Sequence, residues 1–154
     1  MSAMSPPVLR VAEPRDSGDL LAWRNDPVTR ANSRNTDPIA RDSHEAWLGR
    51  ALADPDRRIW VAEADGRKLG TVSAAVTGAD AVEVSITVAP DQRGRGVGGA
   101  MLRACVAETA RTWPDRGIVA TVRVENAVSR RLFERCDFVA TGEQDGFVNY
   151  RWAG

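Results

Sequence analysis

The sequence predicts an α/β (α+β) protein that folds as a single domain over residues 1–154. Three observations support this prediction. Short segments alternate apolar and polar residues as strands do, longer segments repeat apolar residues at helical spacing, and turn residues separate the two kinds. The segments follow the order β α α β β β α β α β β. At 154 residues the chain suits one core, because single cores run to roughly 100–150 residues.

The strands are predicted from alternation, β-branched residues and flanking turns. One antiparallel hairpin is expected around the turn Ala64-Asp65-Gly66, and another at the end of the chain. The segment Val82–Val88 alternates strictly, which gives Glu83, Ser85 and Thr87 one shared polar face. The predicted strands are Val8–Val11, Arg58–Glu63, Leu69–Val76, Val82–Val88, Ile118–Val124, Phe138–Thr141 and Phe147–Trp152.

The helices are predicted from apolar stripes and from start and stop signals. The first should end before Asp26-Pro27, because a residue before proline is pushed out of the helical region, and a loop then runs to about Ile39. The second should begin at Asp42-Ser43-His44-Glu45, which has the form of a capping box. The predicted helices are Asp16–Asn25, Asp42 to about Pro55, Val97 to just before Pro114, and Ala127–Cys136.

The composition is that of a globular protein, with 43% hydrophobic and 27% charged residues. Lys+Arg and Asp+Glu number 21 each, so no overall field would attract nucleic acid or an anionic membrane, and neither partner is expected. No segment approaches the roughly 20 apolar residues of a membrane span. The N-terminal MSAMSPPVLR lacks the apolar stretch of a signal peptide. We therefore expect a cytoplasmic protein, with residues 1–6 disordered.

The two cysteines, Cys105 and Cys136, lie in apolar helical patterns with no CxxC motif and no histidine partner nearby. This setting is typical of buried free thiols. Neither a disulfide framework nor a metal site is indicated.

A glycine-rich turn lies between the polar-faced strand and the long third helix, and it contains Gly94, Gly96 and Gly98. Glycines allow successive backbone N–H groups to point at one position, and the following helix adds the positive end of its dipole. Arg93 and Arg95 add charge beside them. The pattern predicts a site for a phosphate or a pyrophosphate.

Two other interpretations of this turn compete. One is a loop that merely reverses the chain, although two arginines at a helix start argue against it. The residues Gly94 to Gly99 also satisfy the dinucleotide-binding pattern GxGxxG, with Glu125 roughly where a ribose-binding acid would lie. However, five residues, including Pro90, separate the strand from the first glycine, and a doubly wound sheet would need more βα units.

Two motifs carry a family resemblance. Arg93, Gly96 and Gly98 match the R/Q-x-x-G-x-G/A signature of the GNAT acetyltransferase superfamily, and the segment Asn126–Phe138 is similar to its second motif, N-x-x-S-x-x-L/F-Y/F-x-x-x-G-F. The resemblance implies a mixed, mostly antiparallel sheet of about seven strands flanked by four helices. It also implies acetyl-CoA as acyl donor and no metal. The cofactor-binding residues that it implies are Val88, Arg93, Gly94, Arg95, Gly96, Val97, Gly98, Asn126, Ser129 and Phe133.

The resemblance also implies catalytic roles. Glu83 matches the glutamate that relatives use as general base, while a solvated strand glutamate is the alternative. A backbone N–H near Val88 would bond the thioester carbonyl. Asn126 would bond the pantetheine or acceptor side, and it also suits a helix N-cap; both roles are compatible.

The chain departs from the family pattern at two positions. Asp137 replaces a glycine, and aspartate tolerates the left-handed conformation that follows a helix. Phe133 replaces the tyrosine that protonates the leaving thiolate in many relatives. We expect water to supply that proton, since a thiol pKa near about 8.5 makes the thiolate a fairly stable leaving group. Tyr150 is the one tyrosine of the chain, and we interpret it as a core or rim residue.

The segment Leu20–Leu48 resembles UDP-4-amino-sugar N-acetyltransferases of the pseudaminic acid pathway, through Trp23, Arg24, Asn25 and His44. The expected acceptor is therefore the primary amine of a small molecule, with a nucleotide-linked amino sugar as the specific candidate. Core packing is the alternative role for Trp23, and a satisfied structural histidine is the alternative for His44.

Two other functions stay open. One is acetylation of a protein or peptide N terminus, and the other is a CoA-binding module with weak or no catalysis. The sequence indicates a monomer or a homodimer without deciding between them.

Overall fold

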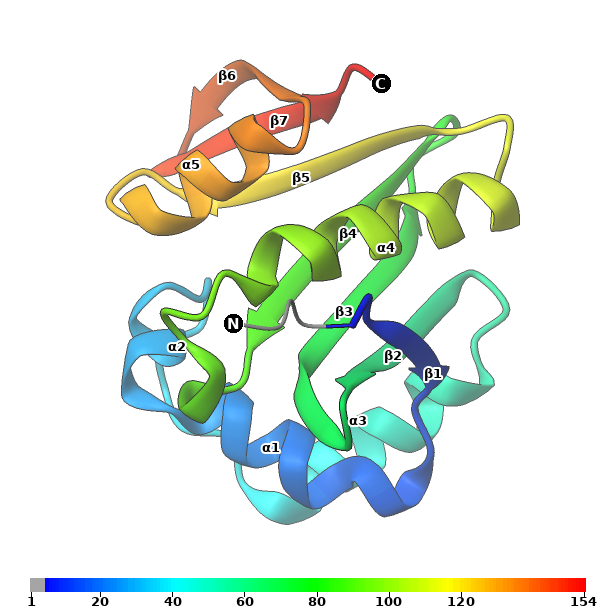
Figure 1. The fold of residues 1–154 in the computed structure, drawn as a ribbon, viewed down its shortest axis with the longest axis vertical. Helices are drawn as coiled ribbons and strands as arrows, with labels where there is room; N and C mark the ends of the chain where they lie inside the picture. The colour runs from blue at the N-terminus through cyan, green and yellow to red at the C-terminus, as the bar shows by residue number, and fades with distance from the viewer. Residues whose placement is uncertain (1–4) are drawn as a thin grey trace.

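A computed structural model describes residues 5–154, built around a seven-stranded sheet in the order β1-β2-β3-β4-β5-β7-β6 (Figure 1). The pairing of β4 with β5 is parallel, and the other neighbouring pairs are antiparallel. This arrangement confirms the predicted mixed, mostly antiparallel sheet. The strands are β1 (Val8–Val11), β2 (Arg57–Ala64), β3 (Arg67–Thr77), β4 (Ala81–Val88), β5 (Gly117–Arg123), β6 (Phe138–Gln144) and β7 (Phe147–Trp152).

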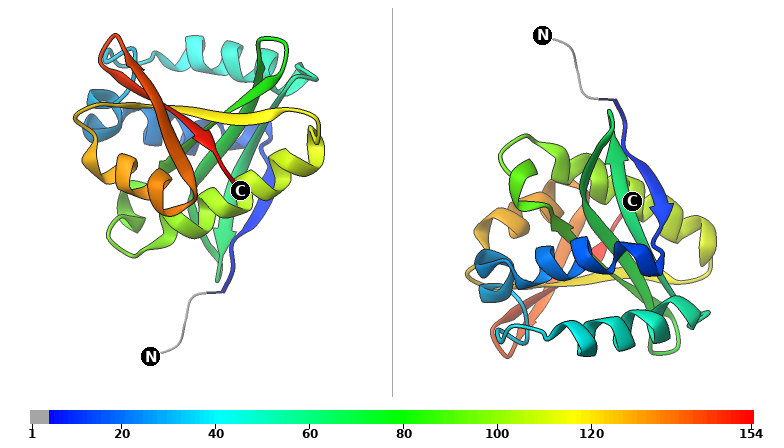
Figure 2. Two further views of the ribbon diagram at one scale, coloured as in Figure 1. Left: turned by 90° about the horizontal axis from the view of Figure 1, so that it is seen from above. Right: turned by 90° about the horizontal axis from the view of Figure 1, so that it is seen from below.

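Helices cover both faces of the sheet (Figure 2). Two of them, α1 and α3, pack on one face, while α4 and α5 pack on the other. Two short 3-10 turns precede α1 and α4, at Pro14–Asp16 (η1) and Pro90–Gln92 (η2). The helices are α1 (Ser17–Asn25), α2 (Pro27–Ala31), α3 (Arg41–Ala53), α4 (Val97–Thr112) and α5 (Ala127–Arg135).

The turns form where the sequence predicts them. Asp65 and Gly66 join β2 to β3 with φ of 53° and 74°, the left-handed pair that suits the twist of a two-residue hairpin. Asp145 and Gly146 repeat this geometry between β6 and β7. Asp137 has φ of 71° directly after α5, so aspartate does fill the left-handed position that glycine usually occupies.

Two local predictions about the first half of the chain are wrong. The expected loop to Ile39 contains α2, in which Asp26 caps the N–H groups of Val28 and Thr29 at 3.1 and 3.3 Å. The proline that ends α1 thus also occupies the first turn of the next helix, a position where it needs no N–H.

The predicted capping box at Asp42 to Glu45 does not form. The N-cap of α3 is Ala40, without a side-chain hydrogen bond, and Glu45 instead pairs with Arg41 at 3.1 Å. The disorder expected for residues 1–6 stays a prediction, since residues 1–4 lie outside the described part of the chain.

Two apolar clusters hold the layers together. The larger lies between the sheet and helices α4 and α5, and it includes Met101, Leu102 and both free cysteines, which are buried as predicted. Burial raises the pKa of the Cys105 thiol to about 12. The smaller cluster joins α1 and α3 to β2 and includes Trp23.

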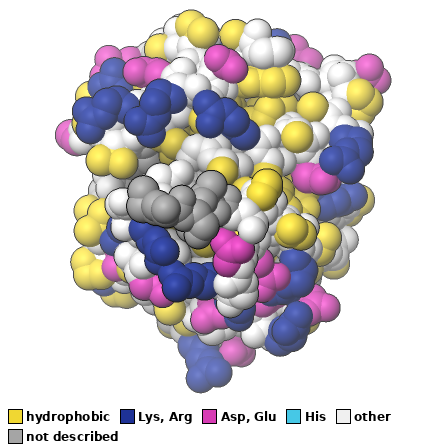
Figure 3. Space-filling model, in the orientation of Figure 1, with side chains coloured by type: hydrophobic (Ala, Val, Ile, Leu, Met, Phe, Trp, Pro, Cys, Tyr) yellow, Lys and Arg dark blue, Asp and Glu magenta, His cyan; other side chains and the backbone are white. Residues whose placement is uncertain are grey.

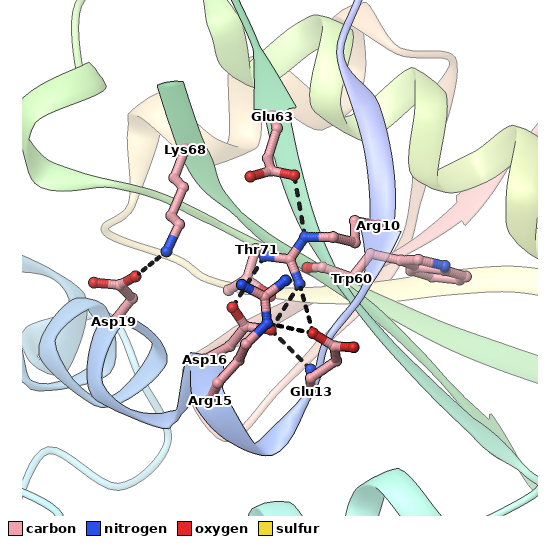
Figure 4. Close-up of polar contacts among 9 residues, drawn as sticks. All are labelled: Arg10, Glu13, Arg15, Asp16, Asp19, Trp60, Glu63, Lys68 and Thr71. Carbon is pink, nitrogen blue, oxygen red and sulfur yellow. Dashed lines mark hydrogen bonds and ion pairs between the residues drawn. The ribbon is translucent and has the colours of Figure 1, made fainter. Parts of the chain in front are cut away.

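An ion pair between the half-buried Arg10 and the buried Asp16 links the start of the chain to the sheet (Figure 4). Arg10 on β1 donates two hydrogen bonds to Asp16, at 2.9 and 3.0 Å, and a third to Glu63 on β2, at 3.1 Å. Asp16 also accepts from the Glu13 N–H at 2.8 Å, and Arg10 holds the pKa of Asp16 below its usual value. The bidentate contact sets how α1 leaves β1. On the face of the molecule shown in Figure 3, basic and acidic side chains are interspersed.

Gly70 on β3 is required by a close approach of two backbones. Its φ is 145°, and a Cβ there would lie 2.2 Å from the Thr87 carbonyl oxygen and 2.9 Å from the Ala89 nitrogen. Gly49, on the exposed side of α3, has no atom within 4 Å of such a Cβ.

We predict that Gly70→Ala lowers the free energy of unfolding by at least about 2 kcal/mol, because the methyl group would push β4 away from β3. The matched change Gly49→Ala should raise it by about 0.5–1 kcal/mol, since alanine favours a helix interior. Urea unfolding of both variants measures the two effects. Equal stability of the two variants would contradict this account of Gly70.

Candidate active site

The parallel strands β4 and β5 separate within the sheet. Their pairing runs from Ala81 with Gly117 to Glu83 with Val119, and it does not extend further among residues 5–154. Figure 1 shows the two strands close at one end and apart at the other, beside the loop that leads into α4. Residues 84–88 therefore have β3 as a partner on one side and an unpaired backbone edge on the other. Such an edge can bind an extended ligand through main-chain hydrogen bonds.

The glycine-rich turn lies at the end of this free edge. Gly94 and Gly96 have φ of 76° and 73°, and Gly96 is the N-cap of α4 without a side-chain cap. A Cβ on either residue would have no atom within 4 Å, so the space beside the turn is open. The first N–H groups of α4 thus meet no capping side chain, and with the helix dipole they make this turn a candidate anion site.

Gly98 brings three elements together at this site. A Cβ there would lie 3.2 Å from Leu132 on α5 and 3.6 Å from Val88 at the end of β4. A glycine at this position therefore lets α4 begin close to both neighbours, which keeps the anion site beside the unpaired edge of β4.

The two arginines of the turn differ in their contacts: Arg93 is paired with a carboxylate, whereas Arg95 is exposed. Arg93 donates to Asp26 at 2.6 Å and to Thr29 at 3.1 Å, which ties the turn to α2 and lowers the pKa of Asp26. Arg95 is exposed beside Gly94. Arg95 is thus the freer of the two cations to meet a phosphate.

The second motif forms the start of α5. Asn126 is the N-cap and accepts a hydrogen bond from the Ser129 N–H at 3.2 Å, so the capping role is confirmed. Phe133 is buried between Phe138 and Tyr150, with ring centroids 5.0 and 6.1 Å away. The Tyr150 hydroxyl donates to Glu134 at 2.8 Å, as expected of a core tyrosine.

Glu83 lies where β4 and β5 separate and is half-buried. Its Oε2 accepts a hydrogen bond from the Thr121 hydroxyl at 3.0 Å, and Thr121 in turn accepts from Arg34 at 3.0 Å. Because a guanidinium can only donate, the hydroxyl proton of Thr121 is available to Glu83. One carboxylate oxygen of Glu83 is thus fixed by the protein, while Oε1 has no partner in the described chain.

A pocket of about 420 Å³ lies between this face of the sheet and helices α1 and α3. Its floor carries hydroxyl groups from β3 and β4, including Ser73 and Ser85, whose oxygens are 2.6 Å apart. Ser85 is two residues along β4 from Glu83 and on the same side, which puts Glu83 at the edge of the floor. The lining residues are Leu20, Trp23, Arg24, Ile39, Ser43, His44, Trp47, Arg57, Ile59, Thr71, Ser73, Ser85 and Thr87.

The charged side chains that line the pocket are both basic, Arg24 and Arg57. The nearest carboxylate described above, Glu83, lies at the edge of the floor and is not a lining residue. His44 is buried, and burial lowers its pKa, so its imidazole is neutral at neutral pH. Its Nδ1 lies 3.2 Å from the Ser17 hydroxyl, so His44 has a structural partner and also faces the pocket.

Trp23, Arg24 and His44 line the pocket, whereas Asn25 is not one of its lining residues. Trp23 is both a core residue, 8% exposed, and a wall of the pocket. The Asn25 amide donates to the Ile39 carbonyl at 2.9 Å and accepts from the Ile39 N–H at 2.8 Å. It thereby holds the loop before α3, and a substrate contact by Asn25 stays a prediction.

The sequence analysis missed Thr121 and Arg123 on β5 as site residues. Both alternate with the buried Ile118, Ala120 and Val122, so the strand pattern already places them on the opposite face. The pattern cannot show that this face lies beside Glu83, because that depends on β5 being the parallel neighbour of β4.

A mixed sheet with a divergent parallel pair, a free strand edge and an anion-binding helix start defines a class of CoA-dependent acyltransferases, as the sequence motifs implied. The chain belongs to the acetyltransferase (GNAT) family, whose pattern matches residues 19–138. The prediction of an acetyl-CoA-dependent N-acetyltransferase is confirmed at this level. No curated protein sequence is detectably similar to the chain.

Solved structures share the fold at low sequence identity. Spermidine N-acetyltransferase from Vibrio cholerae, in complex with CoA and spermine, is 20% identical with a TM-score of 0.83, over 95% of this chain and 93% of that one. An aminoglycoside acetyltransferase in complex with coenzyme A is 20% identical with a TM-score of 0.80, over 94% and 92%. A protein from Salmonella typhimurium, solved with its cofactor acetyl-CoA, is 24% identical with a TM-score of 0.73, over 96% and 91%.

These relatives bind CoA or acetyl-CoA, in agreement with the acyl donor predicted here. In residues 5–154, no three His, Cys, Asp or Glu side chains group as a metal site would need. None of the helices in this part of the chain is both long and apolar enough to cross a bilayer.

We predict that Gly96→Asp weakens acetyl-CoA binding at least tenfold, because a carboxylate at the start of α4 would repel the pyrophosphate. Gly96→Asn is the matched control: it has nearly the same size and also tolerates positive φ, but it carries no charge. Calorimetry gives the affinities, and thermal unfolding checks the fold. Equal losses for the two variants would show that bulk, and not charge, is responsible.

Proposed function

We propose that the protein transfers an acetyl group from acetyl-CoA to a primary amine held in the pocket between the sheet and helices α1 and α3. The supporting observation is the position of Glu83. It lies where the free edge of β4 begins and at the margin of the hydroxyl-lined floor. A donor on the β4 edge and an acceptor in the pocket would therefore meet beside this carboxylate.

The donor would be held by the backbone more than by side chains. The amides at Gly94 to Gly98 and the dipole of α4 would bind the pyrophosphate, with Arg95 as the nearby cation. The Val88 N–H is the proposed donor to the thioester carbonyl, where negative charge develops during attack. Asn126 and Ser129 begin α5 on the other side of the opening and would contact the pantetheine.

The reaction would proceed by direct attack in a ternary complex. Glu83 Oε1 accepts a proton from the amine, directly or through a water molecule, and the neutral nitrogen attacks the thioester carbon. The tetrahedral intermediate collapses as its nitrogen releases the remaining extra proton to water and the carbon–sulfur bond breaks, which yields the amide and the CoA thiolate. Water then protonates the thiolate, since Phe133 carries no hydroxyl group.

The specific acceptor we propose is the amine of a nucleotide-linked amino sugar. Arg24 on the pocket wall suits an anionic group, and Trp23 offers an aromatic surface for a sugar or base. Spermidine, the substrate named for the Vibrio cholerae enzyme, is a polycation, and this pocket has no lining carboxylate to bind one. Cytoplasmic location and a monomeric or homodimeric state stay predictions.

A thiol-release assay with acetyl-CoA and a panel of amines tests this proposal. Transfer to a UDP-amino sugar supports it, whereas transfer only to a peptide N terminus favours the protein-acetylation alternative. Tight CoA binding with no thiol release for any amine would identify a CoA-binding module.

We predict that Glu83→Gln lowers kcat by about 10²- to 10⁴-fold and leaves the KM for acetyl-CoA nearly unchanged, because a general base acts on the amine. Glutamine keeps the shape of the side chain and can still accept from Thr121. Steady-state kinetics at neutral pH measures the effect. A loss of less than threefold in kcat would show that Glu83 is not the general base.

We predict that Thr121→Val lowers kcat by about tenfold, because Glu83 loses the hydrogen bond that fixes its Oε2. Valine has nearly the shape of threonine, so the strand should stay intact. Thr121→Ser keeps the hydroxyl and should act like the wild type. If valine and serine gave the same rate, the hydroxyl would have no positioning role.

A further inference from the structure

Four arginines gather at the segment Ser33–Asn35, which is part of the connection between α2 and α3. Arg123 on β5 donates to the Ser33 carbonyl at 2.6 Å, and Arg24 on α1 donates to the Asn35 carbonyl at 2.7 Å. Arg34 belongs to the segment itself. Burial, and after it the nearby charge of Arg30, lowers the pKa of Arg24. We call Arg24, Arg30, Arg34 and Arg123 the arginine cluster.

The arginine cluster has no anionic partner in the described chain. The ion pairs of residues 5–154 include none of its four members, although they include Arg93 on the neighbouring turn. Buried N–H groups of three members, at Arg24 Nη1, Arg30 Nε and Arg123 Nε, have no hydrogen-bond partner. Charged groups taken out of water without a partner are costly, so this arrangement is typical of a site that receives its counter-charge from a ligand.

Two members of the cluster also share one aromatic ring. The guanidinium carbons of Arg34 and Arg123 lie 5.0 and 4.9 Å from the centroid of Phe147. The ring attracts each cation, and their shared contact with it places two like charges in one region. An oxyanion bound beside the two groups would offset their repulsion, and each planar guanidinium can donate N–H groups to such an anion.

The cluster adjoins the proposed acceptor pocket. Arg24 is part of the pocket wall, and Arg34 reaches Glu83 through Thr121 by two hydrogen bonds of 3.0 Å each. The acidic residues nearest in the chain are Asp26, Asp37 and Glu125. Asp26 is paired with Arg93, while Asp37 and Glu125 are exposed, and none of the three forms an ion pair with the cluster. A ligand with an anionic group on the cluster would therefore hold its other end close to the proposed base.

We propose that the arginine cluster binds a phosphate group of the amine acceptor and so selects acceptors that carry an amine and a phosphate close together. This inference rests on the proposed acetyl transfer and names the chemical class of its acceptor. The phosphates of CoA belong to the glycine-rich turn at the start of α4, so the two anion sites are separate.

The test is calorimetric binding to the protein saturated with CoA, which fills the glycine-rich turn and permits no transfer. The probes are O-phosphoethanolamine and ethanolamine, which differ only in the phosphate. We expect O-phosphoethanolamine to bind at least tenfold more tightly. Arg34→Gln and Arg123→Gln should each reduce this difference at least fivefold, and Arg111→Gln, at an exposed arginine of α4, should not change it.

Equal affinity for the two probes would overturn the inference, and so would a difference that persists in both cluster variants. Arg123→Lys keeps the charge and should retain part of the preference. Thermal unfolding without phosphate checks the fold: Arg34→Gln should be as stable as the wild type or more stable, because it removes a like charge, whereas a purely structural arginine would lower the melting temperature.

A separate measurement distinguishes failure of this inference from failure of the proposed function. Thiol release from acetyl-CoA is followed with both probes and with the panel of amines. If no amine is acetylated but the phosphate preference and its loss in the variants remain, the acetyl transfer fails and the phosphate site stands. If amines are acetylated with no phosphate preference, the transfer stands and the phosphate site fails.

Discussion

The site depends on one constraint in the sheet: β4 and β5 are parallel neighbours whose pairing stops at Glu83 and Val119. Neither strand is left without support, because β4 remains paired with β3 and β5 with β7. On the far face, α4 and α5 fill the space under the separating strands with a continuous apolar cluster. A single break in the pairing of β4 with β5 therefore leaves the edge of β4 free. This edge has the Glu83 carboxylate at its start and the N terminus of α4 at its end.

The face that carries the pocket is organised by charge and by hydrogen bonds to the loop between α2 and α3. Asn25, Arg24 and Arg123 all bond to backbone groups of this loop, and Arg34 extends from it to Thr121. Guanidinium groups hold this loop in place of apolar packing. The arrangement is energetically unfavourable, because each guanidinium group loses hydration when it is covered. A loop that only joined two helices would not require covered guanidinium groups. For this reason we propose that its arginines bind the acceptor.

The chemistry of the leaving group is set by core packing. Phe133 lies against Phe138 and Tyr150, and the Tyr150 hydroxyl already donates to Glu134 and accepts from Arg130. The chain has one tyrosine, so no other phenol can protonate the thiolate. In the proposed mechanism, Glu83 and Thr121 would therefore act on the amine, and no phenol would act on the sulfur. A thiol of moderate pKa makes such an arrangement chemically sufficient.

The features that could be predicted from the sequence are those that local patterns encode. Alternation predicted the strand carrying Glu83, glycine spacing predicted the turn before α4, and two motifs identified the acyl donor. Local signals failed where several structures were compatible with them, as at Pro27, which both ends α1 and begins α2, and at the capping box that α3 does not use. Only the tertiary structure decided that Thr121 meets Glu83 and that arginines from α1, α2 and β5 gather around one loop. Those contacts join residues as far as 90 positions apart, and they follow from the order of strands in the sheet, which no local pattern contains.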